Sequence, residues 1–209
     1  TDKATEFNAV LTTIKGKNPD LVFFGGMDAV GGPMLRQMKQ LGMSQKFMGG
    51  DGIQTPNFVK LAGDAAAEGA MASMPGLPKD QMPGGTKFVE KFKAKFNVDV
   101  ELFAPMGYDA VFVFIEAMKR AKSTEPAKFL PEVGKTDYKG VIGPIAFDDK
   151  GDLKNGPITI YVVKAGKWET MEVVTPGGGD AKPAEAAAPA AAEPAKAAEP
   201  AKAAEPAKK

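Results

Sequence analysis

The chain contains no cysteine and no histidine among its 209 residues, and it has a single tryptophan. The absence of cysteine excludes disulfides and thiol nucleophiles. The absence of histidine also removes most zinc sites and the imidazole general base. We therefore expect a protein that is not an enzyme, with no catalytic residues, no metal site and no cofactor.

Long apolar runs and charge of one sign are also missing. The longest dense apolar run, Ala110–Ile115, lies between Asp109 and Glu116 and predicts a buried helix. It is far shorter than the roughly 18 residues that would suggest a membrane span. The net charge of +1 argues against a nucleic-acid surface. We expect no nucleic-acid partner and no membrane-spanning segment.

The first 75 residues alternate between short apolar strands, glycine-rich loops and helices. The expected strands are Leu21–Phe24, Lys46–Met48 and Gly69–Met74. The helix after the first strand is expected to begin at Pro33 and to end at Gly42. Strands and helices joined this way predict an α/β fold, a parallel sheet with helices on its faces.

The chain reaches its first predicted strand only after a helix. Phe7, Val10, Leu11 and Ile14 have the spacing of one helix face. An α/β sheet of this kind usually begins with a strand. We therefore expect the chain to be a fragment whose N-terminal part is missing.

The loop Met48–Ile53 places Asp51 among three glycines directly after a predicted buried strand. Glycine lets the backbone turn sharply and lets a ligand approach, and a carboxylate there suits a small cation such as an ammonium group. An Asp-Gly turn whose carboxylate only caps nearby amides is the alternative. Ligands bind outside the carboxyl ends of parallel strands, so the loops around Met27 and Asp51 are expected to lie close together on one rim.

A phosphate site is the other use of glycine-rich loops that lead into helices. The loop after the first strand lacks the G-x-G-x-x-G spacing and the G-K-[ST] motif, and Asp28 would repel a phosphate. These features argue against nucleotide binding.

The second half changes in style. Helices are expected from Thr86, over Tyr108–Ala121 and over Pro126–Gly134. Apolar runs at Ile145–Phe147, Ile158–Val163 and Trp168–Val174 then predict antiparallel hairpins. The aspartates of 148–152 indicate a charged turn rather than a calcium loop. After Thr175 the composition narrows to three glycines, 177–179, and then to alanine, proline, lysine and glutamate, which predicts a disordered tail.

Several segments in order resemble one family. They are 18–26, Leu35–Met38, Met48–Ile53, Tyr108–Ala110 and 138–152. As a set they closely resemble the C-terminal part of the leucine/isoleucine/valine-binding proteins of branched-chain amino-acid ABC transporters. The resemblance covers residues 1–174.

The resemblance implies a type I periplasmic-binding-protein fold, in which two hinged lobes with Rossmann-like sheets close over an amino acid. Residues 1–75 would belong to the second lobe, and 76–138 would hold the hinge crossings and first-lobe helices. Residues 139–175 would form second-lobe β-hairpins, followed by the disordered tail at 176–209.

The resemblance also implies a binding site. Asp51 matches an acidic position that takes the ligand's ammonium, with Gly50 beside it. Met27 stands where some members have tyrosine, and it offers an adaptable apolar contact without a hydroxyl. Phe103 and Tyr108 match aromatic positions near the ligand, although Phe103 also suits the core and the Tyr108 hydroxyl also suits the hinge. The residues that grip the ligand carboxylate belong to the upstream half, so we expect weak or no binding by this chain alone.

These features imply an ABC-importer component that binds an aliphatic amino acid by lobe closure and delivers it to a membrane permease. It would be periplasmic, and monomeric when full length. The alternative within the fold is a sensor, receptor or uptake domain for amides, urea or aromatic acids. Two further classes stay open, an enzyme on a Rossmann-like sheet and an interaction protein that works through its tail.

Overall fold

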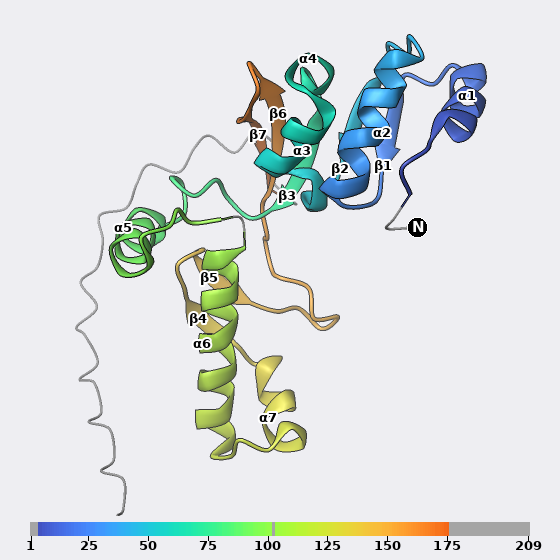
Figure 1. The fold of residues 1–209 in the computed structure, drawn as a ribbon. Helices are drawn as coiled ribbons and strands as arrows, with labels where there is room; N and C mark the ends of the chain where they lie inside the picture. Colours follow the sequence, from blue (N-terminus) through green and yellow to red (C-terminus); the bar gives the residue numbers. More distant parts are fainter. Residues whose placement is uncertain (1–3, 102, 176–209) are drawn as a thin grey trace, which may run out of the picture.

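The computed structural model describes residues 4–101 and 103–175 and is built around a five-stranded sheet of order β1-β2-β3-β6-β7 (Figure 1). The first three strands are parallel, while β6 joins β3, and β7 joins β6, in antiparallel fashion. The strands are β1 (Leu21–Phe24), β2 (Lys46–Gly49), β3 (Met71–Pro75), β6 (Ile158–Lys164) and β7 (Lys167–Val174). The predicted parallel sheet is confirmed.

Helices cover one side of this sheet, where α2 and α3 lie next to each other (Figure 1). The elements of this part are α1 (Asn8–Lys17), α2 (Asp28–Gln40), the 3-10 turn η1 (Asp51–Ile53), α3 (Pro56–Ala62) and α4 (Asp64–Ala67). The core between helices and strands includes Leu11, Leu35, Phe47 and Phe58. Burial of such side chains supplies the main favourable free energy of folding.

The helix expected from Pro33 begins five residues earlier, at Asp28, so Pro33 lies inside α2. The expectation was wrong because tight packing extends the helix. A Cβ on Gly32 would come within 2.6 Å of Leu61 Cβ and 3.0 Å of the Phe58 carbonyl oxygen. Close contact between α2 and α3 offsets the backbone hydrogen bond that proline cannot donate.

The apolar strand β1 is buried on one face only. Val22 is 8% exposed, whereas Leu21 and Phe23 are 38% and 60% exposed. Successive strand side chains point to opposite faces, and the described helices cover only the face that carries Val22. The apolar run therefore reflects two faces of unequal burial.

The remaining elements form a second group, called the helical group below, which lies beneath the sheet in Figure 1. They are α5 (Gly85–Phe96), α6 (Ala104–Ala121), α7 (Pro126–Val133), β4 (Asp137–Lys139) and β5 (Pro144–Ala146). The hairpin expected between Ile145–Phe147 and Ile158–Val163 was wrong, because β5 pairs antiparallel with β4 in a separate two-stranded sheet. The hairpin of β6 and β7 was predicted correctly.

A buried carboxylate ties this small sheet to α6. Asp109 is 1% exposed, and its two oxygens accept hydrogen bonds from the backbone amides of Val141 at 2.9 Å and Ile142 at 2.8 Å. A Cβ on Gly140 would collide with the same carboxylate. The Tyr108-Asp109 motif therefore contains a structural residue that orients the turn between β4 and β5.

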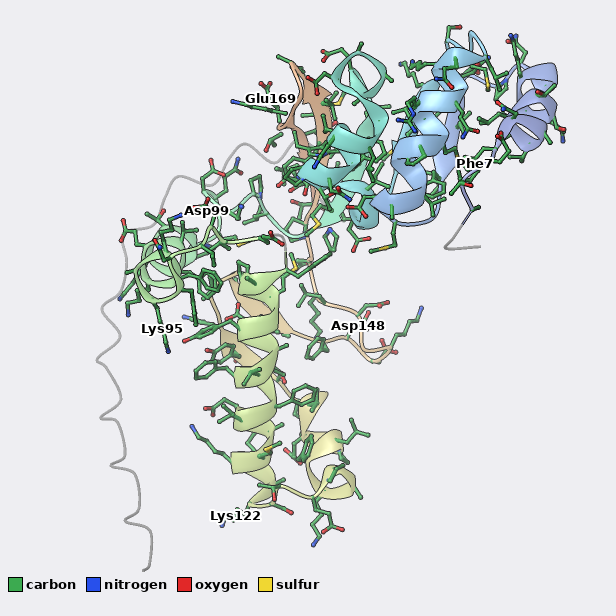
Figure 2. All side chains as sticks on the ribbon, viewed as in Figure 1. Phe7, Lys95, Asp99, Lys122, Asp148 and Glu169 are labelled. Atoms are coloured by element: carbon green, nitrogen blue, oxygen red, sulfur yellow. The ribbon has the colours of Figure 1, made fainter. Side chains whose placement is uncertain are left out.

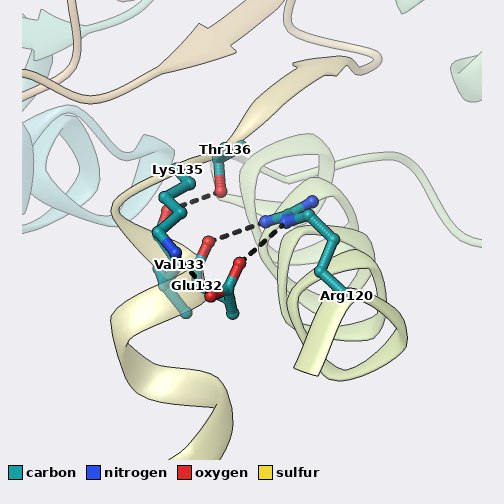
Figure 3. A network of polar contacts seen from close by, with 5 residues as sticks. All are labelled: Arg120, Glu132, Val133, Lys135 and Thr136. Carbon is teal, nitrogen blue, oxygen red and sulfur yellow. Dashed lines mark hydrogen bonds and ion pairs between the residues drawn. The ribbon is translucent and has the colours of Figure 1, made fainter. Parts of the chain in front are cut away.

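The far end of α6 is held to α7 by a polar network (Figure 3). Arg120 donates to the Glu132 carbonyl oxygen at 2.7 Å, and Lys135 pairs with the Glu132 carboxylate at 2.7 Å. The Thr136 hydroxyl donates to the Val133 carbonyl oxygen at 2.6 Å, where the chain leaves α7 for β4. The network stabilises the end of the helical group that lies away from the sheet.

Two chain segments, one after β3 and one before β6, connect the sheet to the second group and lie side by side. Gly76 donates to the Pro157 carbonyl oxygen at 2.7 Å, and its own carbonyl oxygen accepts a 2.7 Å bond from the buried Thr159 hydroxyl. The boundaries at 75, 138 and 175 stay predictions. The Val141 amide donates to Asp109 of α6, and this hydrogen bond favours assigning residues 139–146 to the helical group.

The predicted disordered tail, 176–209, lies outside the described residues. Within the described part, no helix combines the length and the apolar character needed to cross a bilayer.

Replacing Asp109 by alanine should expose the turn between β4 and β5. Two partly buried amides would lose a charged acceptor, which costs about 3 kcal/mol in the folded state. We expect faster hydrogen exchange at Val141 and Ile142, measured by mass spectrometry. Asp99→Ala is the matched control, since Asp99 pairs with the exposed Lys93 and its side chain is 90% exposed. Equal protection in both variants would contradict the structural role of Asp109.

Candidate functional site

The loops that follow β1 and β2 lie against each other at the carboxyl ends of these strands. Phe24 and Gly49, the last residues of the two strands, are register partners. A Cβ on Gly52 would lie 2.7 Å from both the Gly26 carbonyl oxygen and the Met27 sulfur. The expected proximity of the two loops on one rim is thus seen directly.

Asp51 begins the η1 turn on this rim. Within the described residues, no hydrogen bond or ion pair is formed by its side-chain oxygens. The turn is closed through its backbone, since Gln54 donates to the Asp51 carbonyl oxygen at 3.0 Å. The carboxylate that sequence patterns single out is therefore available to an outside cation.

Asp148 shows the opposite arrangement, on a loop between β5 and β6 (Figure 2). One of its carboxylate oxygens accepts from the backbone amides of Lys150 and Asp152, each at 2.9 Å. This carboxylate organises its own charged turn. No group of three acidic residues in the described ranges is arranged to hold a metal ion.

The glycines around Asp51 have different roles. Gly50 has an extended backbone, with φ −81° and ψ −167°, and no described atom lies within 4 Å of a Cβ built on it. Open space there is compatible with a ligand. Close packing instead involves Gly49, where a Cβ would lie 2.6 Å from Ile53 Cδ1, and Gly52.

Met27 precedes α2 and is 62% exposed, so its thioether forms an apolar wall beside the Asp51 turn. The next residue, Asp28, points back into the protein. Its Oδ2 accepts from the Thr55 hydroxyl at 2.7 Å and from the Asn57 side-chain amide at 3.1 Å. The two neighbouring loops are therefore joined by side-chain bonds as well as by contact.

The environment of Asp28 also affects its titration. Partial burial raises the pKa of the Asp28 carboxyl, but hydrogen bonds from Thr55, Asn57 and the Ala29 amide outweigh this effect. The net result holds the pKa of Asp28 below its ordinary value of 3.8. The ionised form is thus stabilised by the fold.

Phe103 and Tyr108 lie at the start of α6, in the helical group. They are 47% and 46% exposed. Tyr108 packs against Phe88 and Phe112, with ring centroids 5.4 and 4.8 Å apart. No described contact joins either residue to Asp51, so the structure does not bring them into one cluster with it.

The start of α6 nevertheless lies close to the sheet. A Cβ on Gly76, directly after β3, would come within 2.9 Å of the terminal methyl of Met106. This contact brings the helical group to the carboxyl end of β3. A ligand on the rim would therefore face α6.

The sequence patterns did not reveal the hydrogen bonds that hold Thr55, next to the η1 turn, in place. Thr55 caps α3 by accepting a hydrogen bond from the Phe58 amide at 3.0 Å. The Trp168 indole of β7 also donates to the Thr55 carbonyl oxygen at 2.9 Å. A single tryptophan in a hairpin was the one available signal, and it did not reveal its partner 113 residues away.

Comparison with known proteins places this arrangement in a family. A family model described as periplasmic binding protein matches residues 1–167. The chain belongs to this periplasmic binding protein family. Both the parallel sheet and the loops at its carboxyl rim lie within the matched range.

The relatives of this periplasmic binding protein include amino-acid-binding proteins. A leucine-, isoleucine-, valine-, threonine- and alanine-binding protein of Pseudomonas aeruginosa is 33% identical over 156 residues, covering 75% of this chain and 41% of that protein. A leucine-specific-binding protein of Salmonella typhimurium is 34% identical over 156 residues, covering 75% and 42%. The chain therefore spans less than half the length of these relatives.

Solved structures show the same fold. A leucine-binding protein from Thermotoga maritima superposes with a TM-score of 0.74 at 29% identity, covering 83% of this chain and 50% of that one. A branched-chain amino-acid transporter substrate-binding protein from Streptococcus pneumoniae, solved with isoleucine, gives 0.69 at 27% identity and covers 83% and 50%.

Substituting Gly52 by alanine should separate the two rim loops. The added methyl group would lie 2.7 Å from two heavy atoms, one of them the Gly26 backbone oxygen. Overpacking of this kind costs about 1–3 kcal/mol. Gly50→Ala is the matched control and should unfold like the wild type. Urea unfolding of both variants measures the difference, and equal stability would contradict the observed contact.

Lowering the pH should remove a stabilising contribution of Asp28. Its pKa is lower in the folded state, so its ionisation stabilises the protein above the unfolded pKa and the effect disappears as pH falls through the folded value. Asp28→Asn should therefore be less stable than wild type at about pH 6, with the gap narrowing towards about pH 2.5. Urea unfolding at each pH tests this. A difference in unfolding free energy that does not change with pH would contradict the prediction. Asp20→Asn serves as the control at an exposed aspartate.

Proposed function

We propose that this chain supplies one half of the ligand site of a solute-binding component of an ABC importer, and that the ligand is an aliphatic, branched-chain amino acid. The observation that carries this proposal is the free Asp51 carboxylate on the rim, beside the apolar Met27 side chain. A cation-binding group next to an apolar wall suits the ammonium and side chain of such an amino acid. The ligands for which the relatives are named support the same class.

In this proposal Asp51 takes the ligand's ammonium. A charge-assisted hydrogen bond of this kind contributes about 1.5–3 kcal/mol. Aspartate is shorter than the glutamate of some family members, so the ligand or the loop would sit slightly closer. Met27 would pack on the ligand's alkyl group, and Gly50 leaves the approach open.

Phe103 and Tyr108 would complete the site from the helical group. The paired connections at Gly76 and Pro157 allow the two groups to move relative to each other as a hinge. Closure would bring the start of α6 over the rim, and a bound ligand would raise the population of the closed form. No covalent step is involved.

The whole protein would act in the periplasm as a monomer and deliver its ligand to the permease subunits. Groups that hold the ligand carboxylate would come from the half of the relatives that this chain does not match. The chain by itself should consequently bind amino acids weakly.

The test is calorimetric titration of leucine, isoleucine and valine into this chain joined to its expected upstream half. Wild type should bind, and Asp51→Ala should weaken binding roughly 10- to 150-fold, the equivalent of the lost charged hydrogen bond. Asp51→Glu should retain most of the affinity because the carboxylate remains.

Asp64→Ala is the matched control, since Asp64 is exposed at the start of α4 and away from the η1 turn. No binding of any amino acid by folded wild type would overturn the proposal. Amides, urea and aromatic acids would then be the next ligands to titrate.

A further inference from the structure

Two acidic side chains follow neighbouring parallel strands on the rim, and the protein uses them differently. Asp51 has no described side-chain partner, whereas Asp28 Oδ2 accepts two side-chain hydrogen bonds, from Thr55 and Asn57. A carboxylate engaged in this way is poorly suited to a ligand. Its bonds instead act on the polypeptide that carries Asp51.

Thr55 connects Asp28 to the η1 turn. The Thr55 amide donates to the Ile53 carbonyl oxygen at 2.8 Å, and the Gln54 amide donates to that of Asp51 at 3.0 Å. The Thr55 hydroxyl, which donates to Asp28, also caps α3 at Phe58. A displacement of Thr55 would therefore move both the turn and the first residues of α3.

The turn has few other side-chain anchors. Gln54 is 8% exposed, but its side-chain oxygen has no hydrogen-bond partner in the described part of the chain. On the far side, the Trp168 indole holds the Thr55 carbonyl oxygen. Thr55 is thus fixed from two directions, by Asp28 of α2 and by Trp168 of β7.

We propose that Asp28 is a positioning residue of the ligand site: its carboxylate holds Thr55 and Asn57, and thereby sets the place of the Asp51 carboxylate, without touching the ligand. This inference rests on the proposed function. It assigns the two rim aspartates to separate tasks, with Asp51 for the ammonium and Asp28 for the loop. Small errors in the position of a binding group are enough to weaken binding.

The experiment compares Asp28→Ala, Asp28→Asn and Asp20→Ala in the chain joined to its upstream half, with leucine as the probe. Alanine removes the acceptor and should raise the Kd about tenfold, while asparagine keeps an acceptor oxygen and should stay within about threefold of wild type. Asp20 is the matched charge control, because it is exposed just before β1, at the opposite end of the strand.

A second measurement needs no ligand. Trp168 is the only tryptophan in the 209 residues, so its emission in this chain reports on the bond to Thr55. Asp28→Ala should change the emission and speed hydrogen exchange at Gln54 and Thr55, with the thermal unfolding of the remaining sheet retained. Asp28→Asn and Asp20→Ala should leave both signals unchanged.

Three results would overturn the inference. Unchanged leucine affinity in a folded Asp28→Ala protein would show that the loop does not need this carboxylate. Equal, large losses in the alanine and asparagine variants would indicate that the charge acts on the ligand directly. If wild type binds no amino acid, the proposed function fails, and unchanged emission and exchange in Asp28→Ala would separately refute the loop-positioning role.

Discussion

The parallel pairing of β1 with β2 is the constraint on which the candidate site depends. Leu21 pairs with Lys46 and Phe24 with Gly49, so the two strands end at the same level. Each strand then passes into a loop and a helix on the same side of the sheet. Because side-chain register cannot slip without exchanging buried and exposed faces, the two loops are fixed against each other. The η1 turn that carries Asp51 lies against Met27 for this reason.

Elements from the end of the chain complete this arrangement. The β6–β7 hairpin joins the parallel strands at β3 and places Trp168 against Phe58, with ring centroids 5.7 Å apart. The same indole binds the Thr55 carbonyl oxygen. The site is thus supported by a strand that follows it by more than 100 residues. A truncation before β7 would remove this support, although every rim residue would still be present in the chain.

The helical group meets the sheet through two adjacent connections and the start of α6. Backbone bonds join Gly76 to Pro157, and Met106 packs beside Gly76. Inside the group, Asp109 binds the turn after β4, while Arg120 and Glu132 join α6 to α7 at the far end (Figure 3). The helical group is held together by polar contacts and is joined to the sheet only at these described connections, an arrangement compatible with movement as one unit.

The sequence by itself determined the parallel α/β pattern and the glycine loops on one rim, and it singled out Asp51 as the candidate ligand-binding acid. These depend on local periodicity, turn residues and the direction of the strands, which are written in short segments. Resemblance to the binding proteins was recognisable for the same reason, since its motifs are contiguous.

Only the tertiary structure decided that β5 pairs with β4 and β6 with β3, that α2 begins five residues before Pro33, and what each aspartate does. Asp28 and Asp51 look alike in the sequence, as polar residues after glycine-rich strand ends. Their roles separate because Thr55 and Asn57 donate to Asp28 across the fold, while Trp168 holds Thr55. Such long-range hydrogen bonds leave no periodic signal in the sequence. The pairing of distant groups is set by packing of the complete core, so it is visible only once the chain has folded.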